Sequence, residues 1–248
     1  MKWEFIAAAC LAFTTGCAIL QNENAPRIAA VRAEGKVIVD GDASELFWQD
    51  APAYPLLVPE DQPGSPECAQ KGWIRFARDD RFLYLYAEVV DDDVVQEENA
   101  DYGNLYETGD VIELFLAPVG SCRYWEFLLA PNGRYAVLFF PGPGRKIFRT
   151  AMRREVRIEV AAKVRGTLNN WSDRDSGYTL EAAIPLAELT RFGDRFESDC
   201  WQLLTGRYNY SVTLPEIEYS GGEEAKREWI KERCDWCITA LNHCLNND

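Results

Sequence analysis

The most constraining feature of this 248-residue chain is a series of short runs rich in β-branched, aromatic and other apolar residues. Turn residues (Gly, Pro, Asn and Asp) bound these runs, which is the sequence pattern of β-strands. The runs cover residues 36–39, 73–78, 82–90, 111–116, 124–130, 135–140, 156–164, 178–184 and 202–211. A chain built mainly of strands must bury one sheet face against another, so we expect an all-β fold of two packed sheets.

Alternation within the runs, and the turns between them, indicate antiparallel pairing. Residues 73–78 partly alternate between apolar and polar positions, whereas residues 82–86 are apolar on both faces, as in a central strand. Asp79 and Asp80 make a tight connection between these two runs, and Pro-Asn-Gly at 131–133 makes another turn. Hairpins at both places predict an antiparallel β-sandwich.

Helical patterns are limited to two stretches. One covers residues 186–189, directly after Pro185, and the other is the charged segment 223–237, in which apolar residues recur at helical spacing. No internal repeat or low-complexity tract divides the chain. We therefore expect one domain over residues 36–248, a sandwich with short peripheral helices.

The N-terminus has the features of a bacterial lipoprotein signal. Lys2 precedes an apolar run at 5–13, and small residues precede Cys17. The apolar run is much shorter than the ~20 residues that span a bilayer. We expect residues 1–16 to be a signal peptide and residues 17–35 to hold the lipidated Cys17 and a tether. An ordinary cleaved signal with an incidental Cys17 is the alternative.

This interpretation places the protein outside the cytoplasm, as a membrane-anchored lipoprotein of the outer membrane that faces the periplasm or the surface and touches the membrane through lipid only. The formal net charge of −14 repels phosphate backbones, so we expect no nucleic-acid partner. Six cysteines remain after the signal and Cys17 are set aside, and an even number in an oxidising compartment predicts disulfides whose pairing stays open. They are Cys68, Cys122, Cys200, Cys234, Cys237 and Cys244.

Five sequence blocks, read in order, carry a resemblance to a known family. They lie at 39–48 (beginning Val-Asp-Gly-Asp and ending Phe-Trp), 82–92, 106–116, 124–133 and 177–185. Each block alone is unspecific, but their order is similar to that of the family 9 carbohydrate-binding modules. The resemblance implies an immunoglobulin-like or jelly-roll sandwich.

The same resemblance implies a function. Members of the family are non-catalytic modules, often attached to hydrolases of plant polysaccharides, that hold sugar ends between aromatic rings. We therefore expect a carbohydrate-binding module on the cell envelope that binds plant or microbial poly- or oligosaccharide in support of carbohydrate breakdown or uptake. We expect no enzyme activity of its own, although it could act alongside glycoside hydrolases.

The candidate sugar site centres on Tyr106, which matches a family Trp. A pyranose offers apolar faces to aromatic rings and hydroxyl groups to carboxylates, amides or Arg. Glu107, Asp110 and Glu113 follow Tyr106 in the order that the resemblance implies. The second aromatic wall of the family has no counterpart at 241–244, where the residues are Leu, Asn, His and Cys.

Four further residues are candidate ligand contacts. Arg207 and Asn209 follow the family's pattern at the end of a strand, and Trp171 lies in a polar loop. His243, the only His, matches a family His that either bonds a hydroxyl or ties the C-terminal strand to the sheet.

A structural calcium ion is the one cofactor that the residues suggest. Asp91 and Asp92 belong to an acidic loop, carboxylates are ligands that Ca²⁺ prefers, and relatives in the family hold calcium. A solvated acidic loop without metal is the alternative.

Other functions have less support in the sequence. Among 40 acidic residues no pair is singled out as the two carboxylates of a glycosidase. A haem-binding sandwich would have to use Met152 and His243 as axial ligands. A structural or assembly lipoprotein of the envelope that binds no sugar stays open as a further alternative.

Overall fold

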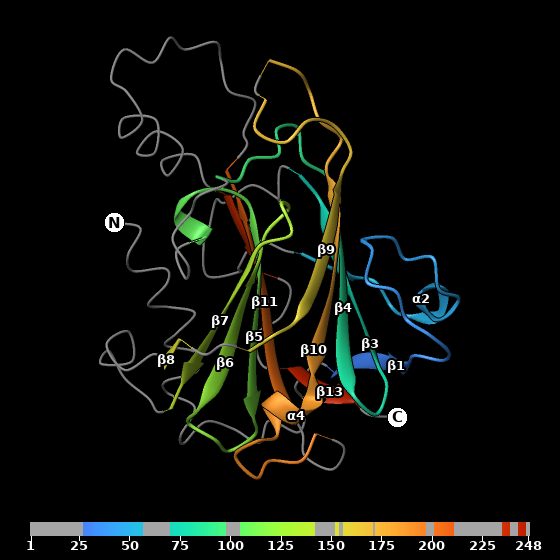
Figure 1. Ribbon diagram of the computed structural model, residues 1–248, viewed down its shortest axis with the longest axis vertical. Helices are drawn as coiled ribbons and strands as arrows, with labels where there is room; N and C mark the ends of the chain where they lie inside the picture. The colour runs from blue at the N-terminus through green and yellow to red at the C-terminus, as the bar shows by residue number, and fades with distance from the viewer. Residues whose placement is uncertain are drawn as a thin grey trace.

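Two β-sheets face each other in the computed structural model, with β5, β6, β7 and β11 on one side and β3, β4, β9 and β10 on the other (Figure 1). The structure describes residues 27–56, 70–97, 105–141, 152–153, 156–170, 172–196, 201–210, 235–238 and 243–246. The strands are β1 (Arg27–Arg32), β2 (Tyr54–Pro55), β3 (Gly72–Arg78), β4 (Phe82–Val89), β5 (Val111–Pro118), β6 (Tyr124–Leu129), β7 (Tyr135–Phe140), β8 (Met152–Arg153), β9 (Glu159–Val164), β10 (Tyr178–Pro185), β11 (Trp201–Asn209), β12 (Asp235–Ile238) and β13 (His243–Asn246). The helices are α2 (Phe47–Asp50), the 3-10 turn η2 (Leu105–Glu107) and α4 (Leu186–Leu189).

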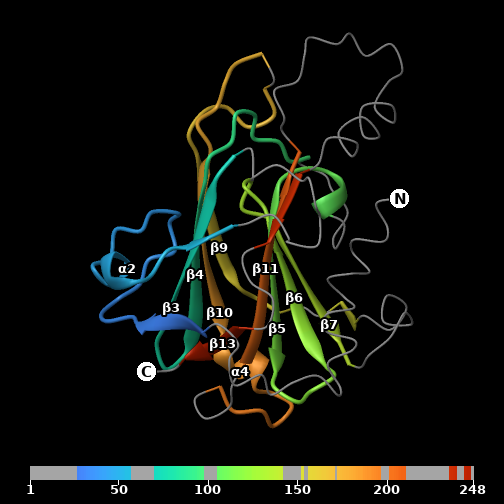
Figure 2. The same cartoon turned by 180° about the vertical axis from the view of Figure 1, so that it is seen from behind.

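The strand order shows how the two sheets are joined. The first sheet runs β8-β7-β6-β5-β11, and the second runs β1-β3-β4-β10-β9, with β2 on the edge of β3. Strand β13 pairs with β11 of the first sheet and with β1 of the second sheet. Strands β13 and β1 therefore join the two sheets, as the reverse view also shows (Figure 2). Pairing is antiparallel except that β1 runs parallel to β13 and to β3. The prediction of an all-β sandwich is confirmed.

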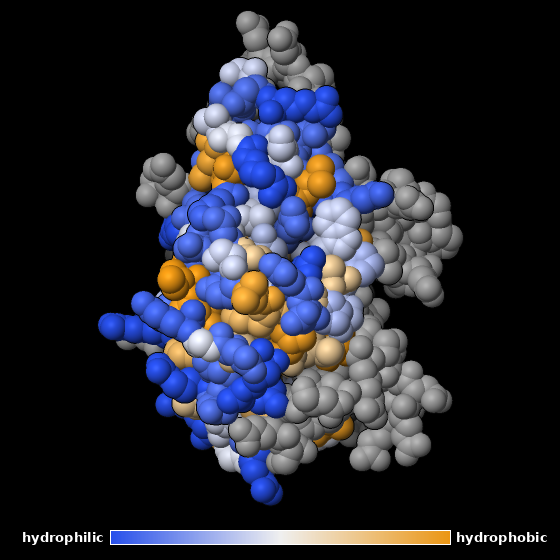
Figure 3. All heavy atoms as spheres, turned by 90° about the vertical axis from the view of Figure 1, so that its right-hand side faces the viewer, coloured by the Kyte–Doolittle hydropathy of each residue, from blue (hydrophilic) through white to orange (hydrophobic). Residues whose placement is uncertain are grey.

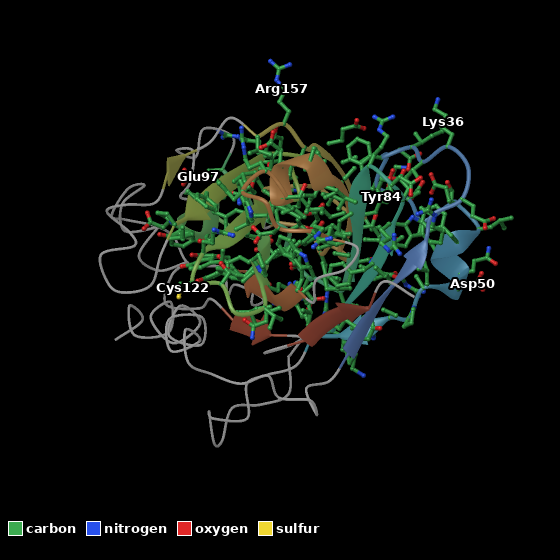
Figure 4. All side chains as sticks on the ribbon, turned by 90° about the horizontal axis from the view of Figure 1, so that it is seen from below. Lys36, Asp50, Tyr84, Glu97, Cys122 and Arg157 are labelled. Atoms are coloured by element: carbon green, nitrogen blue, oxygen red, sulfur yellow. The ribbon has the colours of Figure 1, made fainter. Side chains whose placement is uncertain are left out.

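Apolar side chains from the facing sides of both sheets form the main core. Alternate residues of each strand point inward, so β5 and β6 contribute one set and β4 and β10 another. Figure 4 shows these side chains filling the space between the sheets. Burial of each large apolar side chain stabilises the fold by about 1.5–3 kcal/mol. The core includes Leu85, Ala87, Ile112, Leu114, Leu116, Trp125, Phe127, Leu129, Leu180 and Ala182.

One predicted strand is wrong. Residues 36–39 lie in a loop, although Val37 and Val39 do turn toward a smaller apolar cluster around Trp48. The backbone N–H of Ile38 donates to the carboxylate of Glu45 instead of to another strand. The alternation of apolar and polar residues in this segment therefore reflects the packing of its side chains on this cluster, and not membership of a sheet. The other predicted runs each overlap an observed strand.

The sequence block at 39–48 is fixed to the second sheet through Glu181 of β10. Its carboxylate accepts hydrogen bonds from the backbone N–H groups of Asp40 and Gly41, and from the indole N–H of Trp48. Thr179 donates its hydroxyl to the carbonyl of Gly41. Figure 3 views this side of the molecule and shows hydrophobic patches among hydrophilic residues.

The helices and the N-terminal boundary also differ in part from expectation. Helix α4 confirms the prediction at 186–189, and α2 and η2 were not expected. The predicted helix at 223–237 is wrong at its end, because residues 235–237 belong to β12, and the remainder lies outside the described residues. Residues 27–32, assigned to the tether, form β1. Within the described part of the chain, no helix is long and apolar enough to span a bilayer.

Candidate functional site

The first sheet has a second side, here called the outer face, which points away from the main core. Its side chains alternate with the core residues along each strand. Two apolar clusters and two acids lie on it, and the pairing registers place them side by side. Its residues are Val111, Glu113, Phe115 and Ala117 of β5, Tyr124, Glu126 and Leu128 of β6, Ala136, Leu138 and Phe140 of β7, and Leu204, Gly206 and Tyr208 of β11.

Glu113 and Glu126 form an acid pair in the middle of the outer face. Glu113 lies opposite Leu128, and Phe115 lies opposite Glu126, so the two acids are diagonal neighbours on adjacent strands. Their exposed fractions are only 4% and 7%. Within the described residues, no hydrogen bond to either carboxyl group is recorded. On the other side of β5, Glu113 lies opposite Gly206, which adds no side chain beside it.

The surroundings of the acid pair disfavour negative charge. Burial raises the pKa of Glu126 to about 8. Burial, and secondarily the charge of Glu126, raises the pKa of Glu113 well above its ordinary value. The one basic residue in the sequences of β5, β6, β7 and β11 is Arg207, which points to the opposite side of the sheet. These four strands thus place no cation on the outer face, whereas Arg153 of β8 pairs with Leu138 of that face, and its side chain lies outside the description.

Aromatic rings flank the acid pair at both ends. Tyr106 of η2 lies with its ring centroid 5.8 Å from that of Tyr208. Toward the other end, Tyr124 stacks on Phe140 at 4.4 Å. The Tyr106 side chain is partly exposed and packs on the apolar cluster that contains Leu128. The face therefore combines ring surfaces with hydrogen-bonding carboxyl groups.

Asp110, predicted as a ligand contact, is fully buried beneath the η2 segment. One carboxylate oxygen accepts the backbone N–H of Val95 at 2.8 Å, and the other accepts that of Tyr210 at 2.9 Å. The hydroxyl of Tyr210 in turn donates to the carbonyl of Tyr106. Asp110 therefore positions the segment that carries Tyr106 and has its oxygens occupied by protein groups.

Arg207 and Asn209, also predicted as ligand contacts, lie on the inner side of β11. Arg207 is fully buried, donates to the carboxylate of Asp91 at 2.7 Å and donates to the carbonyl of Gln70 at 3.1 Å. Asn209 donates its amide to the side chain of Gln70 at 3.0 Å. The structure does not bring these two side chains to the outer face. The physical reason is strand parity, which turns residues 207 and 209 inward and Tyr208 outward.

The remaining predicted contacts are placed less completely. Glu107 is partly exposed on η2, next to Tyr106. The backbone of His243 pairs with Leu203 at the start of β13, while its side chain lies outside the description. Trp171 lies outside the described residues altogether. Sequence reasoning missed Glu126, although an acid inside the apolar run at 124–130 was a usable signal.

The acidic loop after β4 does not fit calcium at the residues that were expected to hold it. Asp91 is paired with buried Arg207, and Asp92 is paired with Arg174 at 2.6 Å. In the described ranges, no group of three or more His, Cys, Asp or Glu side chains is arranged to hold a metal ion. Because arginine already neutralises both carboxylates, we derive no role for a metal at Asp91 and Asp92.

The family model described as carbohydrate family 9 binding domain-like matches residues 39–196. This chain belongs to the carbohydrate family 9 binding domain-like family. The matched region of the family 9-like domain contains Tyr106, Glu113 and Glu126.

Solved structures have the same fold as this family 9-like domain. A structure described as a carbohydrate-binding protein from Bacteroides uniformis ATCC 8492 has a TM-score of 0.59 and 15% identity, over 88% of this chain and 90% of that chain. A family 9 module from Caldicellulosiruptor kristjanssonii in complex with cellotriose has a TM-score of 0.50 and 15% identity, over 90% of this chain and 94% of that chain. No curated protein matches the chain. The structural likeness concerns the fold alone.

Proposed function

We propose that this family 9-like domain binds carbohydrate on its outer face and does so without catalysis. The observation that carries the proposal is the acid pair of Glu113 and Glu126, lying between aromatic rings on one side of the sheet. Family membership supports carbohydrate binding as the general function. The cellotriose complex of the Caldicellulosiruptor module supports a gluco-oligosaccharide as the first ligand to test.

Each group has a distinct role in the proposed site. Tyr106 and Tyr208 provide a ring wall for the apolar face of a pyranose. With a pKa of about 8, the carboxyl group of Glu126 is protonated near neutral pH, so it can both donate to and accept from sugar hydroxyl groups. Glu113, whose pKa burial also raises, is its diagonal neighbour. Asp110 contributes indirectly, because its hydrogen bonds fix the segment that carries Tyr106.

Calorimetry with cellotriose tests this proposal. Tyr106→Ala and Glu113→Gln should each weaken binding at least about tenfold, because each removes a ring contact or a buried polar contact. Glu159→Gln on exposed β9 of the other sheet is the matched control and should bind like the wild type. Equal affinity in all four proteins would place the ligand elsewhere. Release of glucose from cellotriose would contradict a non-catalytic role.

The proposal extends to the location of the protein. The N-terminal features support export, lipidation of Cys17 and a role for the anchored domain in carbohydrate breakdown or uptake at the envelope. Mass spectrometry of protein from a bacterial host should find a diacylated Cys17 at the mature N-terminus. Cys17→Ser should leave a protein without lipid, and an unmodified N-terminus in the wild type would contradict the anchor.

A further inference from the structure

The segment that carries Tyr106 is held by a buried amide from the other sheet. Gln96 lies in the loop that follows β4 of the second sheet, and its side chain is fully buried. The amide nitrogen of Gln96 donates to the carbonyl of Leu105 at 3.2 Å and to that of Asp110 at 3.1 Å. Its side-chain oxygen accepts the hydroxyl of Thr108 at 2.6 Å. One side chain therefore bonds both ends and the middle of this segment.

The backbone beside Gln96 also lies against the same segment. Gln96 forms an isolated antiparallel bridge with Gly109, and the backbone N–H of Asp110 donates to the carbonyl of Val95 at 2.7 Å. A Cβ atom at position 109 would collide with the carbonyl oxygen of Val95, so glycine permits the close approach of the two backbones. These backbone contacts bring the amide of Gln96 within reach of its three partners.

A second amide fixes Gln96 itself. Asn169 belongs to the connection between β9 and β10, and its side-chain oxygen accepts the backbone N–H of Gln96 at 2.8 Å. Its amide nitrogen donates to the backbone carbonyl of Gln96, also at 2.8 Å. The loop after β4 and this connection lie at the same end of the sandwich (Figure 1). Loops of the second sheet therefore set the position of Gln96, although the segment that it holds leads into the first sheet.

Gln96 and Tyr106 differ in what they can contact. Gln96 is 0% exposed, and both its amide nitrogen and its oxygen have protein partners, so it does not reach a ligand. Tyr106 is partly exposed, and its ring lies beside that of Tyr208. A ring that binds a sugar gives most affinity when it is already held in the bound orientation, because less conformational freedom is then lost on binding.

We propose that Gln96 is a positioning residue for carbohydrate binding, which holds the segment of Tyr106 so that the ring is oriented to receive the face of a pyranose. Gln96 acts through Tyr106 and does not touch the sugar. This inference rests on the proposed carbohydrate-binding function, and it makes the affinity of a site on the first sheet depend on a buried amide from the second.

A double-mutant cycle, measured by calorimetry with cellotriose, tests whether Gln96 acts through Tyr106. Gln96→Met keeps the approximate length of the side chain and removes its three hydrogen bonds. In the wild-type background this substitution should weaken binding at least about fivefold, since the ring loses its preorganisation. In the Tyr106→Ala background it should change the dissociation constant less than about twofold, because the ring that Gln96 positions is already absent.

Two threonines provide controls against a general loss of folding. Thr108→Val removes the hydroxyl that donates to Gln96 and should weaken binding, whereas Thr108→Ser keeps a hydroxyl and should bind like the wild type. Thr179→Val removes a buried hydroxyl that donates to the carbonyl of Gly41 on the second sheet, and it should leave binding unchanged. Urea unfolding verifies that each variant is folded under the conditions of the titration.

Amide hydrogen exchange in the ligand-free protein tests the positioning without any sugar. Gln96→Met should accelerate exchange at the amides of Thr108 and Asp110 at least about tenfold, because the segment then opens more often. In the wild type these amides donate to the carbonyls of Leu105 and Val95. Amides of the central strand β6 should exchange at the wild-type rate.

The outcomes separate this inference from the function beneath it. An equal loss of affinity in both backgrounds, or a loss in Thr179→Val as large as that in Gln96→Met, would overturn the positioning role. Unchanged exchange at Thr108 and Asp110 would overturn it too, whatever the protein binds. Failure of the wild type to bind cellotriose would contradict the proposed function itself, even where the exchange result shows that Gln96 holds the segment.

Discussion

At the scale of single residues, strand parity decides which of the predicted contacts can reach a ligand. Neighbouring residues of β11 point to opposite sides, so Arg207 is buried in an ion pair while Tyr208 packs against Tyr106. Sequence reasoning identified Tyr106 and Glu113 from a resemblance. It could not separate the inner from the outer side of β5, because all eight of its residues are buried. Apolar character on both faces removes the alternation that otherwise reveals orientation.

The buried ion pair of Arg207 and Asp91 should be essential to stability. Arg207→Ala should lower the free energy of unfolding by about 3–5 kcal/mol, because it leaves the fully buried carboxylate of Asp91 without its cation. Urea unfolding measures this loss. Arg174→Ala, which breaks the exposed pair with Asp92, is the control and should cost no more than about 1 kcal/mol. Similar losses in the two variants would show that Arg207 has no special structural role.

The acid pair should make stability depend on pH. The folded pKa of Glu126, about 8, lies above its ordinary value of 4.5, so ionisation of this group opposes folding. The penalty is absent below pH 4.5, grows as the pH rises from there toward 8, and levels off above pH 8, where the group is ionised in both states. We expect the melting temperature of the wild type to fall between pH 6 and pH 9 more steeply than that of Glu126→Gln. Parallel pH profiles for the two proteins would contradict a raised pKa.

At the scale of elements, local pattern predicted the central strands well and the joining strands poorly. The runs at 82–90, 111–116 and 178–184 form central strands because their apolar residues fill a core between two sheets. Strands β1 and β13 were not predicted because their partners are distant in sequence, and β13 is only four residues long. Pairing over such distances depends on the assembled sheets, which a local pattern does not encode.

Strand β1 should be part of the domain and not part of a tether. Ile28 and Ala30 are buried, and β1 pairs with one strand of each sheet. A chain that begins at residue 33 should therefore lose at least about 3 kcal/mol of unfolding free energy, since it loses core side chains and the bridge between sheets. A chain that begins at residue 24 keeps β1 and is the control. Equal stability of the two chains would contradict this prediction and would support a tether that extends to residue 35.

At the scale of the whole molecule, the two sheets have different proposed tasks. The second sheet anchors the block at 39–48 through Glu181, and the first sheet carries the nearly buried acid pair on its outer face. The overall charge of −14 suits a ligand that carries no phosphate, sulfate or carboxylate. We therefore assign a supporting role to the second sheet and carbohydrate binding to the first sheet, which agrees with the family membership and with the side chains on the outer face.

Backbone amide NMR during titration with cellotriose tests this division most directly. We expect the chemical-shift changes to concentrate on β5, β6, β11 and η2, around Glu113, Glu126, Tyr208 and Tyr106. Amides of β3, β4, β9 and β10 should change little, because they belong to the other sheet. Shift changes that concentrate on the second sheet, or an absence of change at saturating ligand, would contradict carbohydrate binding on the outer face.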